Sequence, residues 1–255
     1  MEFDIKKFVE EFKKTVDLML RGKHTKQIMS DLQIFKNCKD ILEKDSDSPD
    51  ALRVLIKLIK SKGWRLNLPG NFDDEIDGFL KKHGRKLRTS AAKTDLIKLV
   101  GSDKTANIEQ LIKFPSIEKF TKHLYYLATQ GQTLVLGEKG RDNYLRDFGH
   151  WDRIPIDRIE MRFIIRTGIY HACSTGEERD PLEKSSLHDT LARFSSTYLK
   201  GKMVGDIDLG NAPGIVDTFI WSYSAEERYQ ICVKNPKCEE CNLNKACLYS
   251  IFRTP

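Results

Sequence analysis

Four of the six cysteines in this 255-residue chain stand close together near its end, and they constrain the fold more than any other feature of the sequence. They are Cys232, Cys238, Cys241 and Cys247, separated by five, two and five residues. A quartet that closes so short a loop in an intracellular protein is typical of metal binding rather than of disulfides. Four thiolates hold either zinc or an iron–sulfur cluster. The sequence therefore predicts a small metal-bound loop over residues 232–247, with disulfides as the remaining alternative.

Most of the chain has the apolar spacing of α-helices. Phe8, Phe12 and Val16 recur at helical intervals after Asp4, a residue suited to cap a helix. Further helices are expected from Ser48-Pro49 onward and over residues 71–82, 91–100, 116–131, 141–149, 157–170, 186–199 and 215–223. No convincing strand alternation is present, so we expect an all-α protein. Cys38 and Cys173 stand alone and are expected to be small buried hydrophobes.

Charge and hydropathy narrow the classes of partner. The net charge of +6 favours a polyanionic partner without proving one. No apolar run has the length that crosses a bilayer, and residues 1–14 lack the apolar core of a signal peptide. We therefore expect an intracellular protein with no membrane partner. The basic run at 81–88 is interpreted as a solvated loop, with a place on a nucleic-acid path as the alternative.

The segment from Leu134 to Phe163 carries the candidate chemistry. Its parts follow one another as Leu136-Gly137-Glu138-Lys139, Leu145-Arg146-Asp147-Phe148-Gly149 and Ile154-Pro155-Ile156-Asp157. This order resembles the active-site segment of the helix-hairpin-helix DNA glycosylases, in particular the endonuclease III branch. The resemblance implies that Lys139 is the catalytic lysine and Asp157 the catalytic aspartate. Arg162, five residues after the aspartate, also fits the family pattern.

A second alignment of the same segment is possible. Shifting the frame by three makes Gly140 the last glycine of the hairpin and puts Asp142 in the place of the lysine, which leaves no nucleophile. The first alignment replaces one hairpin glycine by Val135 but preserves both the lysine-to-aspartate interval and the Phe148-Gly149 pair. We therefore prefer the alignment that places the nucleophile at Lys139.

The cysteine spacing is similar to the [4Fe-4S] loop of endonuclease III and of the related adenine glycosylases, although its first gap is one residue short. On this resemblance we favour an iron–sulfur cluster over zinc. The resemblance also implies two lobes. One is a six-helix barrel over residues 23–152, with the helix-hairpin-helix motif at about 116–149. The other joins residues 1–22 to 153–255, with an insertion around 176–186.

The function that the resemblance implies is base-excision DNA repair. Such an enzyme rotates a damaged or mispaired base out of the duplex and cleaves its glycosidic bond. A Schiff base on Lys139 would add AP-lyase activity. DNA contacts are expected from Gly137, Gly140, Arg141, Arg146, Lys237 and Lys245. Two alternatives stay open: a monofunctional glycosylase that uses Asp157 and water, and a non-catalytic DNA-binding protein with a structural metal site. We expect a monomer that binds double-stranded DNA, and the sequence does not name the lesion.

Overall fold

The computed structural model describes residues 3–44, 49–61, 68–84, 86–114, 116–132, 137–176 and 183–253. Most of this part is helical, and its β-structure is one pair of two-residue strands. The all-α expectation is therefore confirmed apart from a minimal hairpin. None of the helices in these ranges has the length and apolar character needed to cross a membrane.

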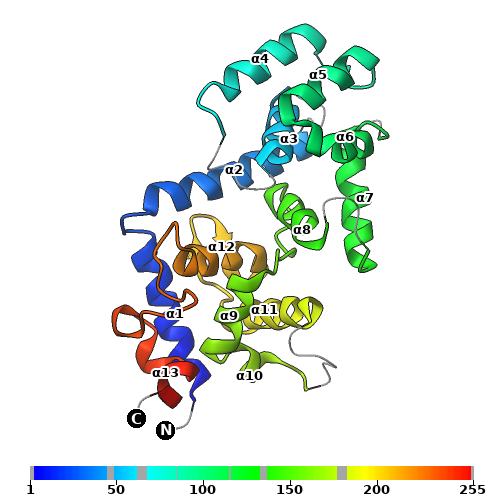
Figure 1. Ribbon diagram of the computed structural model, residues 1–255. Helices are drawn as coiled ribbons and strands as arrows, with labels where there is room; N and C mark the ends of the chain where they lie inside the picture. Colours follow the sequence, from blue (N-terminus) through cyan, green and yellow to red (C-terminus); the bar gives the residue numbers. More distant parts are fainter. Residues whose placement is uncertain are drawn as a thin grey trace. The chain divides into compact units, whose positions relative to one another are not determined.

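The chain forms two compact units. One joins Met1–Gln33 to His150–Pro255, and the other is Ile34–Gly149 (Figure 1). The expected lobes had their boundaries at residues 22/23 and 152/153. The first boundary differs because α2 (Thr25–Lys44) is one continuous helix, and the division falls inside it.

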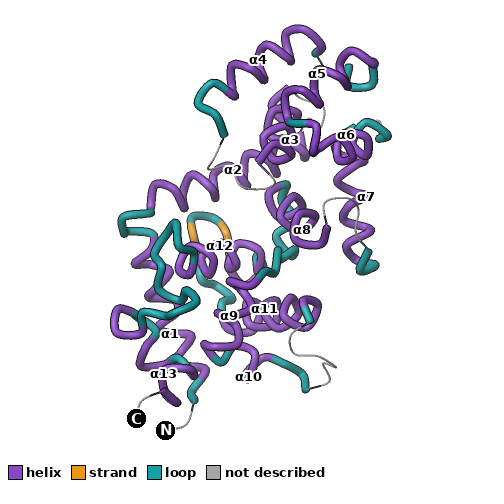
Figure 2. The backbone as a smooth tube through the Cα atoms, in the orientation of Figure 1, coloured by secondary structure: helices purple, strands orange, loops and turns teal. Residues whose placement is uncertain are grey.

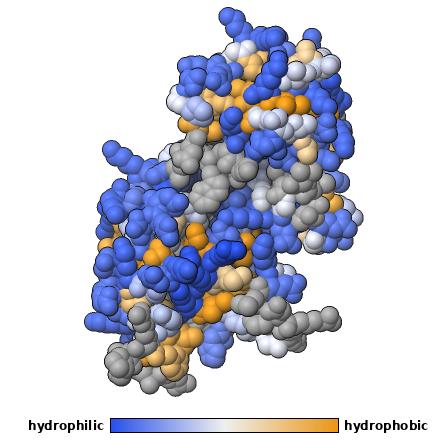
Figure 3. Space-filling model, in the orientation of Figure 1, coloured by the Kyte–Doolittle hydropathy of each residue, from blue (hydrophilic) through white to orange (hydrophobic). Residues whose placement is uncertain are grey.

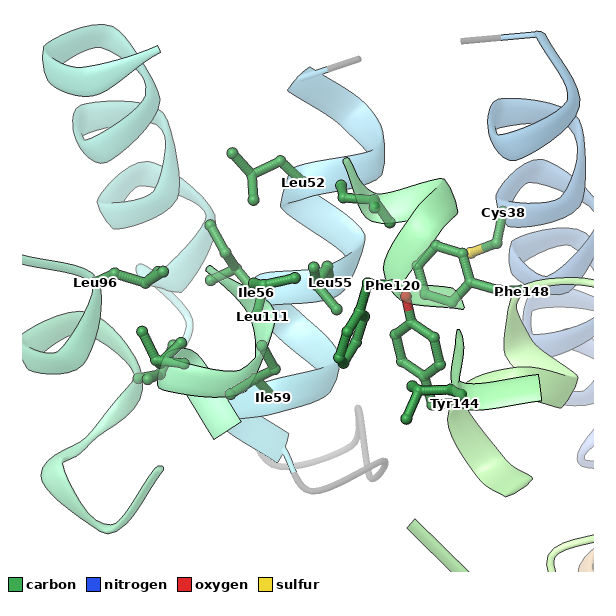
Figure 4. Close-up of a cluster of buried hydrophobic side chains, with 14 of the residues drawn as sticks. Cys38, Leu52, Leu55, Ile56, Ile59, Leu96, Leu111, Phe120, Tyr144 and Phe148 are labelled. Carbon is green, nitrogen blue, oxygen red and sulfur yellow. The ribbon is translucent and has the colours of Figure 1, made fainter. Parts of the chain in front are cut away.

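The unit Ile34–Gly149 is built around one apolar core. Its elements after α2 are α3 (Pro49–Ser61), α4 (Phe72–His83), α5 (Ser90–Val100), the 3₁₀ helix η2 (Ser102–Lys104), α6 (Thr105–Leu111), α7 (Ile117–Thr129) and α8 (Gly137–Asp147). The helices turn their apolar faces to this core. Its buried side chains include Leu55, Ile56, Leu96 and Phe120 (Figure 4). Cys38 is fully buried in it, as expected for an isolated cysteine.

Tyr144 fixes α8 against α7 within this core. Its ring stacks on Phe148 with centroids 4.5 Å apart and meets Phe120 edge-on at 5.6 Å. Its hydroxyl forms a buried 2.9 Å hydrogen bond with the Thr121 hydroxyl on α7. A buried aromatic ring with a satisfied polar end specifies one orientation of the helix that carries it. The position of Lys139 in its unit therefore follows from the core.

The other unit contains the amino-terminal helix and the carboxyl-terminal half of the chain. Its elements are α1 (Ile5–Met19), the start of α2, α9 (Arg158–Thr167), α10 (Ile169–Cys173), α11 (Lys184–Tyr198), β1 (Met203–Val204), β2 (Ile207–Asp208), η3 (Leu209–Asn211), α12 (Pro213–Ser224), η4 (Cys238–Glu240), η5 (Asn244–Ala246) and α13 (Leu248–Arg253) (Figures 1 and 2). As predicted, Asp4 caps α1, and its carboxylate accepts the Lys6 N–H at 2.9 Å.

Aromatic side chains form the centre of this unit. Phe12 on α1 meets Phe163 on α9 at 6.2 Å and Phe194 on α11 at 5.7 Å, both edge-on. Phe163 in turn meets Tyr223 on α12 at 6.4 Å. Four helices thus share one aromatic core. On the surface, hydrophilic residues cover most of the face of the molecule seen in Figure 3. Cys173 is also buried, as expected.

In the carboxyl-terminal half of the chain, two local features differ from what the sequence predicted. The helix expected over 157–170 is interrupted at Gly168, whose φ of +89° lies in the left-handed region, and the chain continues as α10. A side chain at that position would also collide with the ring of Phe3. The hairpin of β1 and β2 was not foreseen, because two paired residues per strand leave no alternation to detect.

Candidate functional site

Lys139 is the third residue of α8 and is partly exposed. The helix expected over 141–149 begins four residues earlier, so the lysine lies in the first helical turn and not in a turn before the helix. Gly137 opens this helix with a φ of +64°, a conformation that favours glycine. Glu138 follows it, and an acidic residue is favourable at a helix amino terminus. Residues 133–136 of the expected hairpin lie outside the described residues.

Asp142, the alternative to Lys139, is held inside its own unit. It is 6% exposed, and both of its carboxylate oxygens accept hydrogen bonds from Arg141, from Nε and from Nη2 at 3.0 Å each. The remaining Nη1 of Arg141 donates to the carbonyl of Gln132 after α7. These contacts give Asp142 a structural partner, whereas Lys139 keeps part of its surface in solvent.

The two arginines expected to contact DNA are engaged within their unit. Arg141 is 4% exposed. Arg146 donates from Nη2 to Asp147 at 3.1 Å, and its guanidinium lies 5.0 Å from the centre of the Phe35 ring. Phosphate contacts by either guanidinium would have to compete with these partners, and they stay predictions. Gly140 lies in the first turn of α8, and Gly137 is exposed with open space beside its Cα.

Asp157 caps α9. Its Oδ1 accepts the Ile159 N–H at 2.6 Å. The preceding Ile154 and Ile156 are buried, so the chain enters the helix from a fixed position. The carboxylate stays partly exposed at the helix end. It can therefore cap the helix and face a cationic group at the same time.

Two carboxyl groups near Asp157 were missed by the sequence interpretation. Glu160 completes a capping box, since its Oε2 accepts the Asp157 N–H at 2.8 Å. Asp217 approaches from α12, and both side chains are 1% exposed. Burial raises the pKa of Glu160 well above its ordinary value, and the charges of Asp217 and Asp157 raise it further. The Asp157-x-x-Glu160 spacing was visible in the sequence, but the approach of Asp217 was not.

The four clustered cysteines line one small cavity of about 20 Å³. Cys232 and Cys247 are buried, and Cys238 and Cys241 are partly exposed. Phe163 and Thr167 of α9 and Tyr223 of α12 also border this space. All six cysteines are free thiols, so the disulfide alternative has no support in the geometry.

Hydrogen bonds tie the cysteine loop to α9 and α12. Arg166 donates to the carbonyls of Val233 at 2.6 Å and Lys234 at 2.9 Å. The Tyr223 hydroxyl donates to the Cys241 Sγ at 3.4 Å and accepts the Asn242 N–H at 3.1 Å. The loop is therefore held in place by partners other than its own cysteines.

The donor set of this cavity fits a thiolate-bound metal. Burial raises the pKa of Cys247 to about 11 and also raises the pKa values of Cys232 and Cys241. Metal binding would displace these thiol protons. Within the described ranges, no three His, Cys, Asp or Glu side chains are already grouped as a coordination shell. The shared cavity, and not a preformed set of metal–sulfur distances, is what favours a metal here.

The basic residues differ in their surroundings. Lys237 and Lys245 of the cysteine loop are exposed, as DNA contacts require. In the basic run, Lys82 and His83 both bind Asp95, at 2.7 and 2.8 Å, and lower the pKa of that carboxylate to about 2. Lys81, Lys86 and Arg88 are exposed, and Arg85 lies outside the described residues. This pairing favours a solvated helix end over a continuous phosphate path.

No protein-family model, curated protein or solved structure matches this chain.

Proposed function

We propose that this protein is a base-excision DNA glycosylase of the helix-hairpin-helix type, with an AP-lyase step through Lys139 and a [4Fe-4S] cluster held by the four clustered cysteines. One observation carries the proposal: α9 joins the two features that the sequence resemblance requires. Asp157 caps its first turn, and Arg166 and Thr167 at its end border the cysteine loop.

The proposed reaction begins with a nucleotide rotated out of the duplex, because the glycosidic bond is not accessible inside the stack. The neutral amine of Lys139 attacks C1′, and the base leaves with the electron pair of the glycosidic bond. Positive charge builds on the sugar in the transition state, and the Asp157 carboxylate stabilises it. The C1′–O4′ bond then breaks as the lysine nitrogen forms a C=N bond to C1′, and O4′ takes up a proton released from that nitrogen. Loss of a C2′ proton from this imine expels the 3′ phosphate and nicks the strand.

The cluster has a structural part in this proposal. Cys232, Cys238, Cys241 and Cys247 would supply all four ligands, so no iron site is left open for a substrate. The bound cluster would hold residues 232–247 as a small folded loop. Lys237 and Lys245 on this loop are exposed and would meet DNA phosphates. Affinity for DNA should therefore fall as salt is added.

Base release from a panel of duplexes, each with one lesion, tests the proposal and identifies the substrate. The panel contains oxidised pyrimidines, oxidised guanine, mismatched uracil or thymine, and alkylated purines. We expect release of at least one of these bases, with strand nicking in the absence of any added lyase. Release without nicking would support the hydrolytic alternative that uses Asp157 and water. Binding of every duplex with no release would contradict glycosylase activity and favour a DNA-binding role.

A further inference from the structure

Glu160 is a buried carboxyl directly behind the proposed catalytic aspartate. It is 1% exposed, and its Oε2 accepts the main-chain N–H of Asp157 at 2.8 Å. Its carboxyl group also lies beside the carboxylate of Asp157. One side chain therefore contacts both the backbone and the reactive end of the residue on which the proposed chemistry depends.

Asp217 adds a third acidic group to this place. It lies on α12, which packs against α9, and it is also 1% exposed. The charged groups that act most strongly on Glu160 are Asp217 and Asp157, and both are acidic. Glu160 and Asp217 are removed from water, and desolvation and mutual repulsion both disfavour their charged forms. The partly exposed Asp157 adds to the repulsion. A proton held by one of the two buried groups relieves both penalties.

We propose that Glu160 holds this proton at neutral pH and acts as a positioning residue for Asp157. The proton itself follows from the three-carboxyl geometry, and only its catalytic consequence rests on the proposed function. As a neutral acid, Glu160 keeps Oε2 as the acceptor for the Asp157 N–H. Its O–H then donates to a neighbouring carboxylate, Asp157 or Asp217.

The protonated form preserves the charge that the reaction needs. With Glu160 neutral, Asp157 keeps its negative charge for the developing cation on the sugar. Loss of the proton would place a second negative charge against Asp157 and weaken its fixed orientation on the Ile159 N–H. Excision should therefore decline on the alkaline side as Glu160 ionises. Burial and the neighbouring carboxylates raise the pKa of Glu160 well above its ordinary value, and the proton is lost as the pH rises past that raised pKa.

Infrared spectroscopy tests the proton without any substrate, because a protonated carboxyl and a carboxylate absorb at different frequencies. We expect wild-type protein at pH 7 to show a protonated carboxyl that Glu160→Gln removes. The control is Glu183→Gln, at an exposed position where the glutamate makes no capping bond, and it should leave the signal unchanged. No protonated carboxyl in the wild type, or the same signal in Glu160→Gln, would overturn the proposal.

Asp217→Asn provides a second test that does not alter Glu160. Removing one negative neighbour should let Glu160 release its proton at lower pH than in the wild type. If Glu160→Gln fails to fold, this shift tests whether Glu160 holds the proton. A Glu160 titration in Asp217→Asn that matches the wild type would refute the proposal.

The pH profile of excision distinguishes the protonation of Glu160 from its positioning role in catalysis. Glu160→Gln cannot ionise, so it should lose the alkaline decline of the wild type, which is up to about tenfold per pH unit for a single group. An unchanged decline in this variant would refute the positioning role. The expected infrared result together with no excision by the wild type would contradict the proposed function alone.

Discussion

At the residue scale, Asp157 combines a helix-capping role that the structure shows with the catalytic role that we propose. Asparagine caps helices about as well as aspartate but has no charge. Asp157→Asn should therefore lower single-turnover excision by about a hundredfold or more, while the free energy of unfolding changes by less than about 0.5 kcal/mol. Asp157→Ala should also destabilise the protein, by about 1 kcal/mol.

The control is Asp4→Asn, which makes the same change at the capping residue of α1. It should alter neither the rate of excision nor the free energy of unfolding. Urea unfolding gives the stability of each variant. If Asp157→Asn excised bases at the wild-type rate, helix capping would be the only role left for this carboxylate.

The candidate residues differ in how far the sequence predicts them. Asp157 before an apolar helical segment predicts a cap, and the structure confirms it. Lys139 was expected in a turn but lies in α8, because Gly137 opens the helix with a positive φ that no local pattern announces. Asp217 could not be linked to Glu160 from sequence, since their approach depends on the packing of α12 against α9.

At the scale of elements, the buried pair of Arg141 and Asp142 connects α8 to the end of α7. Asp142→Asn would leave the Arg141 guanidinium buried without its carboxylate partner. Removing one member of a buried ion pair costs about 3–5 kcal/mol, so the unit Ile34–Gly149 should lose most of its stability. Amide hydrogen exchange in α7 and α8 measures this loss.

Glu109→Gln is the control for that experiment, because it removes an ion pair with Lys93 that is exposed to solvent. Its effect should be small by comparison, since exposed pairs contribute little. Equal protection of α7 and α8 in Asp142→Asn and Glu109→Gln would show that the buried pair does not hold α8.

The starts of two capped helices, α5 and α7, were predicted closely. Thr89 and Ser116 accept the N–H groups of Ala92 and Lys119, and α5 and α7 begin within a residue of the positions expected. By contrast, α2 was not expected as a helix. It has a weaker apolar stripe than α1, so its periodicity is harder to recognise in the sequence.

At the scale of the whole molecule, the cysteine loop should stabilise only the unit that contains it. Anaerobically purified protein is expected to contain iron and sulfide in near-equal amounts. Cys241→Ala should lose this iron and increase proteolysis in Met1–Gln33 and His150–Pro255, with Ile34–Gly149 less affected. Metal analysis and limited proteolysis check both effects.

Cys173→Ala is the matched control, because it removes a buried free thiol of the same unit outside the loop. It should keep the iron. Stoichiometric zinc without sulfide in the native protein would contradict the cluster and would make the short first gap between Cys232 and Cys238 the informative feature.

The sequence predicted the all-α class but not the boundary between the two units. The expected division followed the resemblance, whereas the structure places it inside α2, a helix that local patterns did not reveal. The cysteines were predicted to share a site from spacing alone, and they line one cavity. The cysteine loop is held by Arg166 and Tyr223, which stand 66 and 9 positions before Cys232 in the sequence. Their contacts with the loop could be identified only from the structure.

The central claim is that Lys139 forms a Schiff base with the sugar. Borohydride trapping on a duplex that carries one lesion released by the protein tests it most directly, because only a Schiff base is reduced to a covalent protein–DNA adduct. We predict an adduct with wild-type protein, none with Lys139→Gln, and undiminished trapping with Lys122→Gln, an exposed lysine on α7. DNA binding by Lys139→Gln should persist. Trapping of Lys139→Gln as efficient as that of the wild type would contradict the account, because another amine would then be the nucleophile.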